Sequence, residues 1–127
     1  MNKMKLSEKQ LKQIKGWIEE ARIRLLMYDW TINTKIDNSM EGVMMKCDPD
    51  RTYMNAMIAM SEAEVLKDWK LYGDKYMRCV CFHEVLHAFM APFVDMAFAR
   101  HISFGHLDEE KERLTERLAK IISGHVK

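Results

Sequence analysis

Two histidines and a glutamate in the stretch His83-Glu84-Val85-Leu86-His87 have the spacing of a zinc site. Residues four apart on a helix lie one turn apart on the same face, so His83 and His87 can direct their imidazoles at one point. Imidazole nitrogen is a common ligand of zinc, which is usually four-coordinate. Glu84 lies beside that point and can take a proton from a zinc-bound water. The pentad therefore predicts a helix that carries two zinc ligands and a general base.

Two other interpretations of these residues remain open. In the first, the histidines are packed in the core and hydrogen-bonded to the backbone, although burying three polar groups on one stripe is costly without a shared purpose. In the second, Cys79, which lies four residues before His83, completes a structural Cys-His-His zinc site. A free cysteine is more often a small buried residue, so we favour core packing for Cys79.

One amphipathic helix is predicted at the start of the chain. An apolar residue recurs every three or four positions from Leu11 to Leu25, with charged residues mostly outside that stripe. Ser7 precedes it, and Gln10 stands three residues later, as in a capping box. The sequence therefore predicts that this helix begins just after Ser7.

A change to a period of two predicts a small sheet. Residues 30–36 alternate between apolar and polar side chains, residues 43–47 form a second alternating run, and residues 55–60 form a third short apolar run. Turn-forming residues occupy positions 37–39 and 48–50. We expect about three strands.

Helices are predicted for the rest of the chain. Ser61 and Glu64 match a second capping box, and Gly73 with Asp74 separates that short helix from the motif helix. The motif helix should end near Ala91, because Pro92 lacks an N–H group, and a further helical piece would reach residue 100.

A last helix is expected between Asp108, as its N-cap, and Gly124, which ends it. The side chains expected on its buried side are Leu107, Leu114, Leu118, Ile121 and Ile122.

Composition narrows the class of protein. The 127 residues carry 20 basic and 19 acidic side chains, a balance that predicts no binding to nucleic acid or to an anionic membrane. The length suits one domain over residues 1–127. The three cysteines do not form a disulfide framework, which favours a cytoplasmic location. The apolar stretch from residue 79 to 98 contains histidines and acids, which favours a buried helix over a membrane span.

The chain resembles the small zincin-like metallopeptidases, which are often carried by phages and are related to the gluzincins. The likeness covers most of the chain, although only the pentad is a sharp motif. It rests on Trp30-Thr31-Ile32, on residues 53–58, on residues 83–87 followed by Ala91-Pro92-Phe93, and on residues 112–119.

This resemblance implies a zinc site of two histidines and one glutamate, and hydrolysis of a peptide bond. Carried over residue by residue, it assigns His83, His87 and Glu112 as ligands and Glu84 as the catalytic base. Glu116 would then hold a ligand histidine in its tautomer.

Helical geometry alone leaves the third ligand open between Glu112, Glu110 and Glu116. Glu110 lies on the apolar stripe of the last helix, so it points inward more clearly than Glu112 does. Position 93 is Phe, so the histidine that a metzincin carries six residues beyond the second ligand is absent. The extended metzincin pattern therefore does not apply.

We expect an α+β, minimal zincin-like domain with an N-terminal helix, a small sheet, the motif helix and a C-terminal helix that supplies the carboxylate ligand. The predicted function is a Zn²⁺-dependent peptidase in which zinc-bound water attacks a peptide bond of a peptide or protein substrate, with Glu84 as general base. The alternative is a non-catalytic module, stabilised by zinc, that binds a phage or host factor.

Overall fold

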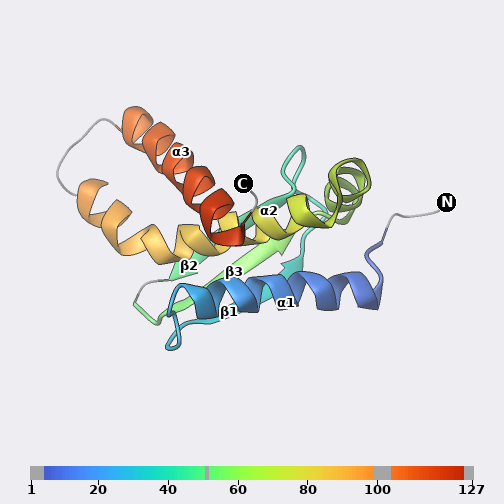
Figure 1. Cartoon of the computed structure of the whole chain (residues 1–127). Helices are drawn as coiled ribbons and strands as arrows, with labels where there is room; N and C mark the ends of the chain where they lie inside the picture. Colours follow the sequence, from blue (N-terminus) through green and yellow to red (C-terminus); the bar gives the residue numbers. More distant parts are fainter. Residues whose placement is uncertain (1–4, 51, 99–103, 125–127) are drawn as a thin grey trace.

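The structure is a computed structural model that describes residues 5–50, 52–98 and 104–124. In these residues the chain forms three helices and a three-stranded mixed sheet, which is an α+β arrangement (Figure 1). The elements follow in the order α1 (Glu8–Arg24), β1 (Thr31–Ile36), β2 (Met45–Asp50), β3 (Asn55–Met60), α2 (Glu62–Phe98) and α3 (Phe104–Ser123).

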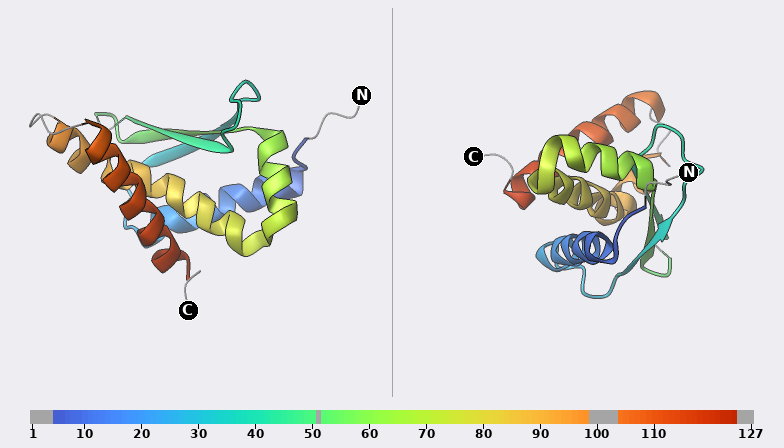
Figure 2. Two further views of the ribbon diagram at one scale, coloured as in Figure 1. Left: turned by 90° about the horizontal axis from the view of Figure 1, so that it is seen from above. Right: turned by 90° about the vertical axis from the view of Figure 1, so that its right-hand side faces the viewer.

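The sheet has the order β1-β3-β2, so β3 is its central strand. β3 pairs with β1 in parallel, from Thr31 opposite Asn55, and with β2 in antiparallel register, from Met45 opposite Met60. The helices lie on one side of the sheet, as the left view of Figure 2 shows. Because β3 is the central strand, β2 lies at an edge of the sheet, and it packs next to α2.

The core forms where α1 and α2 meet the covered face of the sheet. Every second residue of β3 from Ala56 to Met60 points at the helices, as the period of a strand requires. The buried side chains that meet there include Ile14, Ile18, Ile58, Met60, Met77, Phe82, Val85 and Leu86.

The predicted start of α1 is confirmed. The Ser7 hydroxyl accepts a hydrogen bond from the backbone N–H of Gln10, and the Gln10 side chain accepts one from the backbone N–H of Ser7. Ile14, Ile18 and Ala21 are the buried residues of the helix, as the apolar stripe predicts. This reciprocal capping satisfies N–H groups that have no partner within the helix.

The turn predicted at residues 48–50 is wrong, because β2 continues through Pro49 to Asp50. Proline is tolerated there because β2 is an edge strand and need not donate a hydrogen bond on its outer side. The turn follows instead: the Asp50 carboxylate accepts hydrogen bonds from the backbone N–H groups of Thr52 and Tyr53.

The predicted boundary at Gly73 is a sharp kink inside α2. Gly73 has φ 85° and ψ −175°, which only glycine adopts readily. The predicted end of the helix at Ala91 is wrong, because α2 runs through Pro92 to Phe98. Proline removes one backbone hydrogen bond, but buried Ala88 and Ala91 keep this part of the helix packed. The predicted continuation to residue 100 lies partly outside the described residues.

The last helix begins earlier than predicted, at Phe104, so Asp108 lies within α3 and is not its N-cap. Gly124, with φ 73°, ends the helix as predicted. The predicted buried side is wrong in part, because Leu114 and Ile121 are exposed. The buried stripe is instead Thr115, Ala119 and Ser123, with Leu118 and Ile122 partly buried; the side chain of Leu107 lies outside the described parts.

This buried stripe faces α2 and therefore determines which acids of α3 lie on the side of α2. Glu112 and Glu116 lie on either side of Thr115 along the same face of the helix. The Thr115 hydroxyl donates a hydrogen bond to the Lys111 carbonyl, and its oxygen lies 3.5 Å from the Met90 sulfur on α2.

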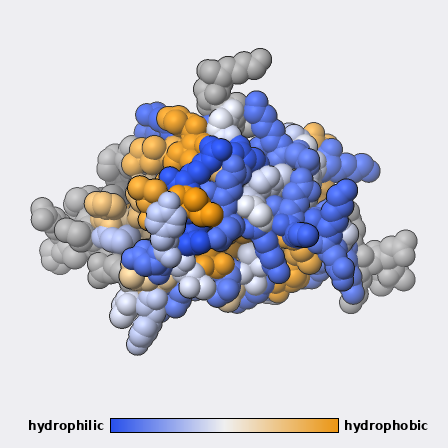
Figure 3. All heavy atoms as spheres, turned by 60° about the horizontal axis from the view of Figure 1, so that its bottom comes forward, coloured by the Kyte–Doolittle hydropathy of each residue, from blue (hydrophilic) through white to orange (hydrophobic). Residues whose placement is uncertain are grey.

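The face in Figure 3 is largely hydrophilic, with hydrophobic side chains gathered in smaller groups. None of the helices in the described ranges combines the length and the apolar character that crossing a membrane requires.

Candidate metal centre

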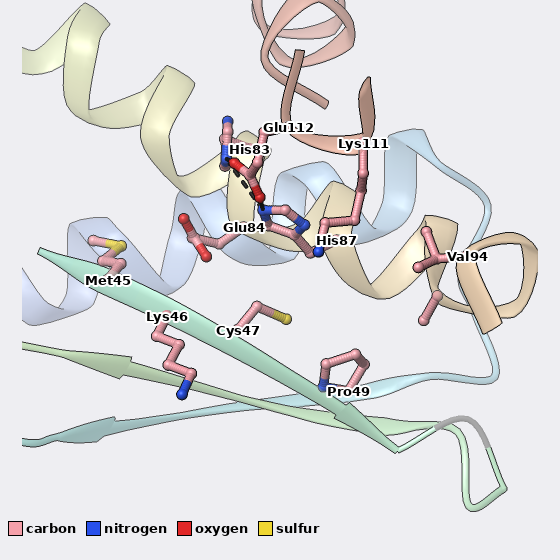
Figure 4. Close-up of a pocket in the computed structure, with 11 residues that line it drawn as sticks. Met45, Lys46, Cys47, Pro49, His83, Glu84, His87, Val94, Lys111 and Glu112 are labelled. Carbon is pink, nitrogen blue, oxygen red and sulfur yellow. Dashed lines mark hydrogen bonds and ion pairs between the residues drawn. The ribbon is translucent and has the colours of Figure 1, made fainter. Parts of the chain in front are cut away.

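The motif residues lie on the part of α2 that passes between β2 and α3. His83, Glu84 and His87 place one ligand atom each within 4.8 Å of one another. Figure 4 shows the two imidazoles between the α2 backbone and Glu112, which reaches down from α3. Two elements far apart in the sequence therefore supply the cluster.

The Glu112 carboxylate contacts both imidazoles, one with each oxygen. Its Oε1 lies 3.1 Å from Nε2 of His87, and its Oε2 lies 3.3 Å from Nε2 of His83. The two Nε2 atoms are 3.2 Å apart. These three groups thus converge on one point through the atoms that bind metals in proteins.

The Glu116 carboxylate orients His83. Its Oε2 lies 2.6 Å from Nδ1 of His83, close enough to accept the Nδ1–H proton. A proton fixed on Nδ1 leaves the lone pair on Nε2, which faces His87 and Glu112. Glu116 therefore occupies the position of a group that sets the tautomer of a ligand histidine.

The Glu84 carboxyl is buried between α2 and β2. Its exposed fraction is 8 %, and the backbone N–H of Cys47 donates a hydrogen bond to it. Burial, followed by the negative charge of Glu112, raises the pKa of Glu84 to about 8. A cation bound beside it would oppose this shift by favouring the carboxylate. A carboxyl with a pKa in this range is suited to both accept and return a proton near neutral pH.

Burial also lowers the pKa of His87, against the opposing effect of the Glu112 charge, and the charges of His83 and Lys111 lower it further. The neutral imidazole is therefore favoured at His87. Neutral imidazole is the form that binds a metal ion.

A cavity of about 470 Å³ opens beside this cluster. Met45, Cys47 and Pro49 point into it from β2, as Figure 4 shows, and Ala91 and Val94 of α2 extend its apolar part. The polar part is formed by His83, Glu84, His87, Lys111 and Glu112, with Lys46 at the β2 side. The wall formed by α2 and α3 therefore carries the histidines and acids, and the opposite wall is the edge strand β2.

The donor set and its spacing fit a zinc ion. Bonds of about 2.0–2.1 Å to a tetrahedral ion place its ligand atoms roughly 3.3 Å apart. The two imidazole nitrogens are 3.2 Å apart, and each lies 3.1 or 3.3 Å from a different oxygen of the Glu112 carboxylate. Two imidazoles and one carboxylate are also a ligand combination found in catalytic zinc sites, where one position stays open.

The alternative ligand Cys79 is not brought into this cluster. It is buried, and its side chain forms a hydrogen bond with Ser123 of α3. The alternative third ligand Glu110 has a side chain outside the described parts of the chain. Of the three candidate acids on the last helix, Glu112 and Glu116 are the ones whose positions are known.

Sequence reasoning missed the contribution of Lys111 and of β2 to the cavity. Lys111 lies in a run of alternating charges that is typical of a solvated helix face, so the sequence does not predict that it lines a cavity. The sequence pattern predicts a strand at Cys47 and a turn at Pro49. A prediction of which sheet edge faces the motif helix would have been needed to place them.

Comparisons with protein-family profiles, with curated proteins and with solved structures gave no match to this chain.

Proposed function

We propose that this protein is a zinc-dependent peptidase. The observation that carries the proposal is the convergence of the His83 and His87 imidazoles with the Glu112 carboxylate, at separations of 3.1 to 3.3 Å, beside a buried glutamate and an open cavity. His83, His87 and Glu112 would hold the ion. The resemblance of the sequence to zincin-like metallopeptidases supports the same assignment.

The ion supplies Lewis acidity, which polarises a carbonyl group and lowers the pKa of water. Glu84 is the general base, because its carboxyl lines the cavity and has an oxygen within 4.8 Å of ligand atoms of both histidines. The water oxygen bonds to the carbonyl carbon, the π electrons move onto the carbonyl oxygen, and Glu84 takes the water's proton. When the carbonyl re-forms, the C–N bond breaks and Glu84 returns the proton to the leaving nitrogen.

A peptide substrate is supported by the cavity wall. β2 is an edge strand, and its residues Met45, Cys47 and Pro49 line the cavity. An extended peptide can pair with such an edge while its side chains fill neighbouring pockets. The apolar part of the cavity favours an apolar side chain next to the cleaved bond. A cytoplasmic location stays a prediction.

The rival function, a binding module with a structural zinc, requires a closed set of four side-chain ligands. The packing of Cys79 against Ser123 argues against Cys79 as the fourth ligand. A buried acid beside an open cavity is also more useful to an enzyme than to a structural site.

The test of the proposed function is the variant Glu84→Gln. It removes the base but leaves the three ligands, so we expect about one zinc per chain as in the wild type, and loss of peptide hydrolysis by at least about 100-fold. Cleavage of a mixed peptide library, followed by mass spectrometry, gives the readout. Full activity in the variant would rule out the role of Glu84. Exposed Glu109→Gln on α3 is the matched control.

A further inference from the structure

A positive charge in the cavity has no role in the mechanism above. The described residues that line the cavity include two lysines, Lys46 and Lys111. Lys46 is exposed and leaves β2 on the side away from the motif helix, whereas Lys111 extends from α3 on the side of His87 (Figure 4). Lys111 is therefore the lysine that shares the wall of the metal ligands.

The Lys111 side chain is held in place rather than free in solvent. Its ammonium lies 2.9 Å from the Asp108 carboxylate one turn earlier, and its side chain is 23 % exposed. Lys67 and Lys120 also pair with an acid one turn away, and their side chains are 61 % and 45 % exposed. Lys111 is thus the most enclosed of the three, with its alkyl chain packed along the cavity.

The order of residues on α3 places this charge next to the ligand carboxylate. Glu112 follows Lys111 in the chain and contacts both imidazoles. The Lys111 side chain extends from α3 next to Glu112. Glu84, Glu112 and Glu116 surround the histidines with acidic groups. Among the described residues that line the cavity, Lys111 is the cation on the side of the histidines that can attract a negative ligand.

We infer that Lys111 binds the negatively charged oxygen of the ligand at the metal, and so acts as the anion-stabilising residue of the proposed reaction. This inference rests on the proposed zinc site. When water attacks a carbonyl, the electron pair of the C=O bond ends on the oxygen, and a fixed cation beside that oxygen stabilises it. The ligand class is a carbonyl compound that becomes an oxyanion, or a small anion that resembles it.

The test is the binding of two small ligands to the cobalt-loaded protein, followed by its visible spectrum. Azide is anionic, imidazole is neutral, and both bind a metal through one nitrogen. In Lys111→Met we expect azide affinity to fall about tenfold and imidazole affinity to stay within about twofold, because only the charge is lost. Lys111→Arg should restore azide binding to within about threefold. Lys67→Met, from a similar ion pair on α2, should bind both ligands as the wild type does.

The possible outcomes are distinct. Unchanged azide affinity in Lys111→Met, with cobalt bound normally, overturns the role of Lys111 and leaves the metal site intact. An equal loss of azide and imidazole binding also overturns it, because that result indicates a distorted site. Failure of the wild type to bind cobalt overturns the proposed function itself. Lys111→Gln serves as a second neutral variant if Lys111→Met does not fold.

Discussion

Individual residues of the cluster differ in what they contribute, and the differences can be separated by substitution. His83, His87 and Glu112 contribute the atoms that converge on one point. Glu116 contacts His83 through Nδ1, at 2.6 Å, which is the nitrogen that faces away from His87 and Glu112, so its effect on a bound ion is indirect. An indirect group should change the affinity for metal without abolishing it.

We therefore predict that Glu116→Gln weakens zinc affinity by about 10–100-fold, because the Nδ1–H of His83 loses a charged acceptor. Competition with a chromogenic chelator measures the affinity. Glu109→Gln, an exposed glutamate on the same helix, should leave it unchanged. Equal affinities for Glu116→Gln and the wild type would mean that Glu116 does not support His83.

At the scale of elements, the position of α3 decides whether Glu112 reaches the histidines. The C-terminal end of α3 is tied to α1 and α2 by Arg78, whose guanidinium donates hydrogen bonds to the Ser123 carbonyl and to both oxygens of Glu20. Arg24 of α1 also donates to the Ile122 carbonyl. These contacts satisfy carbonyl groups at the helix end and fix its place.

The Arg78–Glu20 pair gives a pH-dependent stability. The hydrogen bonds of Arg78 lower the pKa of Glu20, so this pair stabilises the fold above the ordinary glutamate pKa and is lost as pH falls through the lowered value. At pH 7 we predict that Glu20→Gln lowers the free energy of unfolding by about 1–2 kcal/mol, and that the difference from the wild type shrinks below about pH 4.5. Urea unfolding at several pH values measures both.

The control for that prediction is Glu19→Gln, because Glu19 pairs with Arg22 on the surface of the same helix and is 53 % exposed. Its effect should not exceed about 1 kcal/mol. If both variants behave alike at all pH values, the Arg78 contact does not contribute as the geometry indicates.

Alanine substitutions at Gly73, in the α2 kink, and at Gly16, in the regular helix α1, should change the stability of the fold in opposite directions. An added Cβ would meet nothing within 4 Å at either position, so sterics of neighbouring residues do not decide the outcome. Gly73→Ala forces alanine into a glycine-only conformation and should destabilise by about 1–3 kcal/mol. Gly16→Ala lies inside α1 and should stabilise by about 0.5–1 kcal/mol. Thermal unfolding compares them; a neutral Gly73→Ala would mean that the kink is not required.

The sequence predicted the elements better than it predicted their ends. Periodicity and capping identified α1, the three strands and the kink at Gly73, because these signals are local. It failed at Pro49 and Pro92, where edge position and tertiary packing decide whether proline is tolerated. It also failed at the buried side of α3, because small residues rather than leucines face α2.

The same distinction holds for the candidate site. The spacing of His83 and His87 could be read directly, since both lie on one helix. The acid on α3 that approaches the histidines could not be read directly, because helical periodicity favours Glu110. In the structure, Glu112 is the acid described beside both imidazoles. The resemblance to zincin-like peptidases favours Glu112, and the burial of the α3 face that carries Thr115 and Ala119 is the physical reason for its position.

At the scale of the whole molecule, a bound ion would link α2 to α3 through His83, His87 and Glu112. A ligand that binds the folded state alone stabilises it, by about 2.7 kcal/mol at 100 times its dissociation constant. We predict that zinc raises the melting temperature of the wild type and leaves that of His83→Ala unchanged. A similar increase in both proteins would indicate binding elsewhere.

The central claim is that His83, His87 and Glu112 hold one zinc ion. Its most direct test is the metal content, by plasma mass spectrometry, of untagged protein purified without added metal, beside the variants His83→Ala, Glu112→Ala and Glu110→Ala. We predict about one zinc per chain in the wild type and in Glu110→Ala, and little or none in the other two. A wild type that holds no zinc even after incubation with the ion, or a Glu112→Ala variant that retains it in full, would contradict the claim.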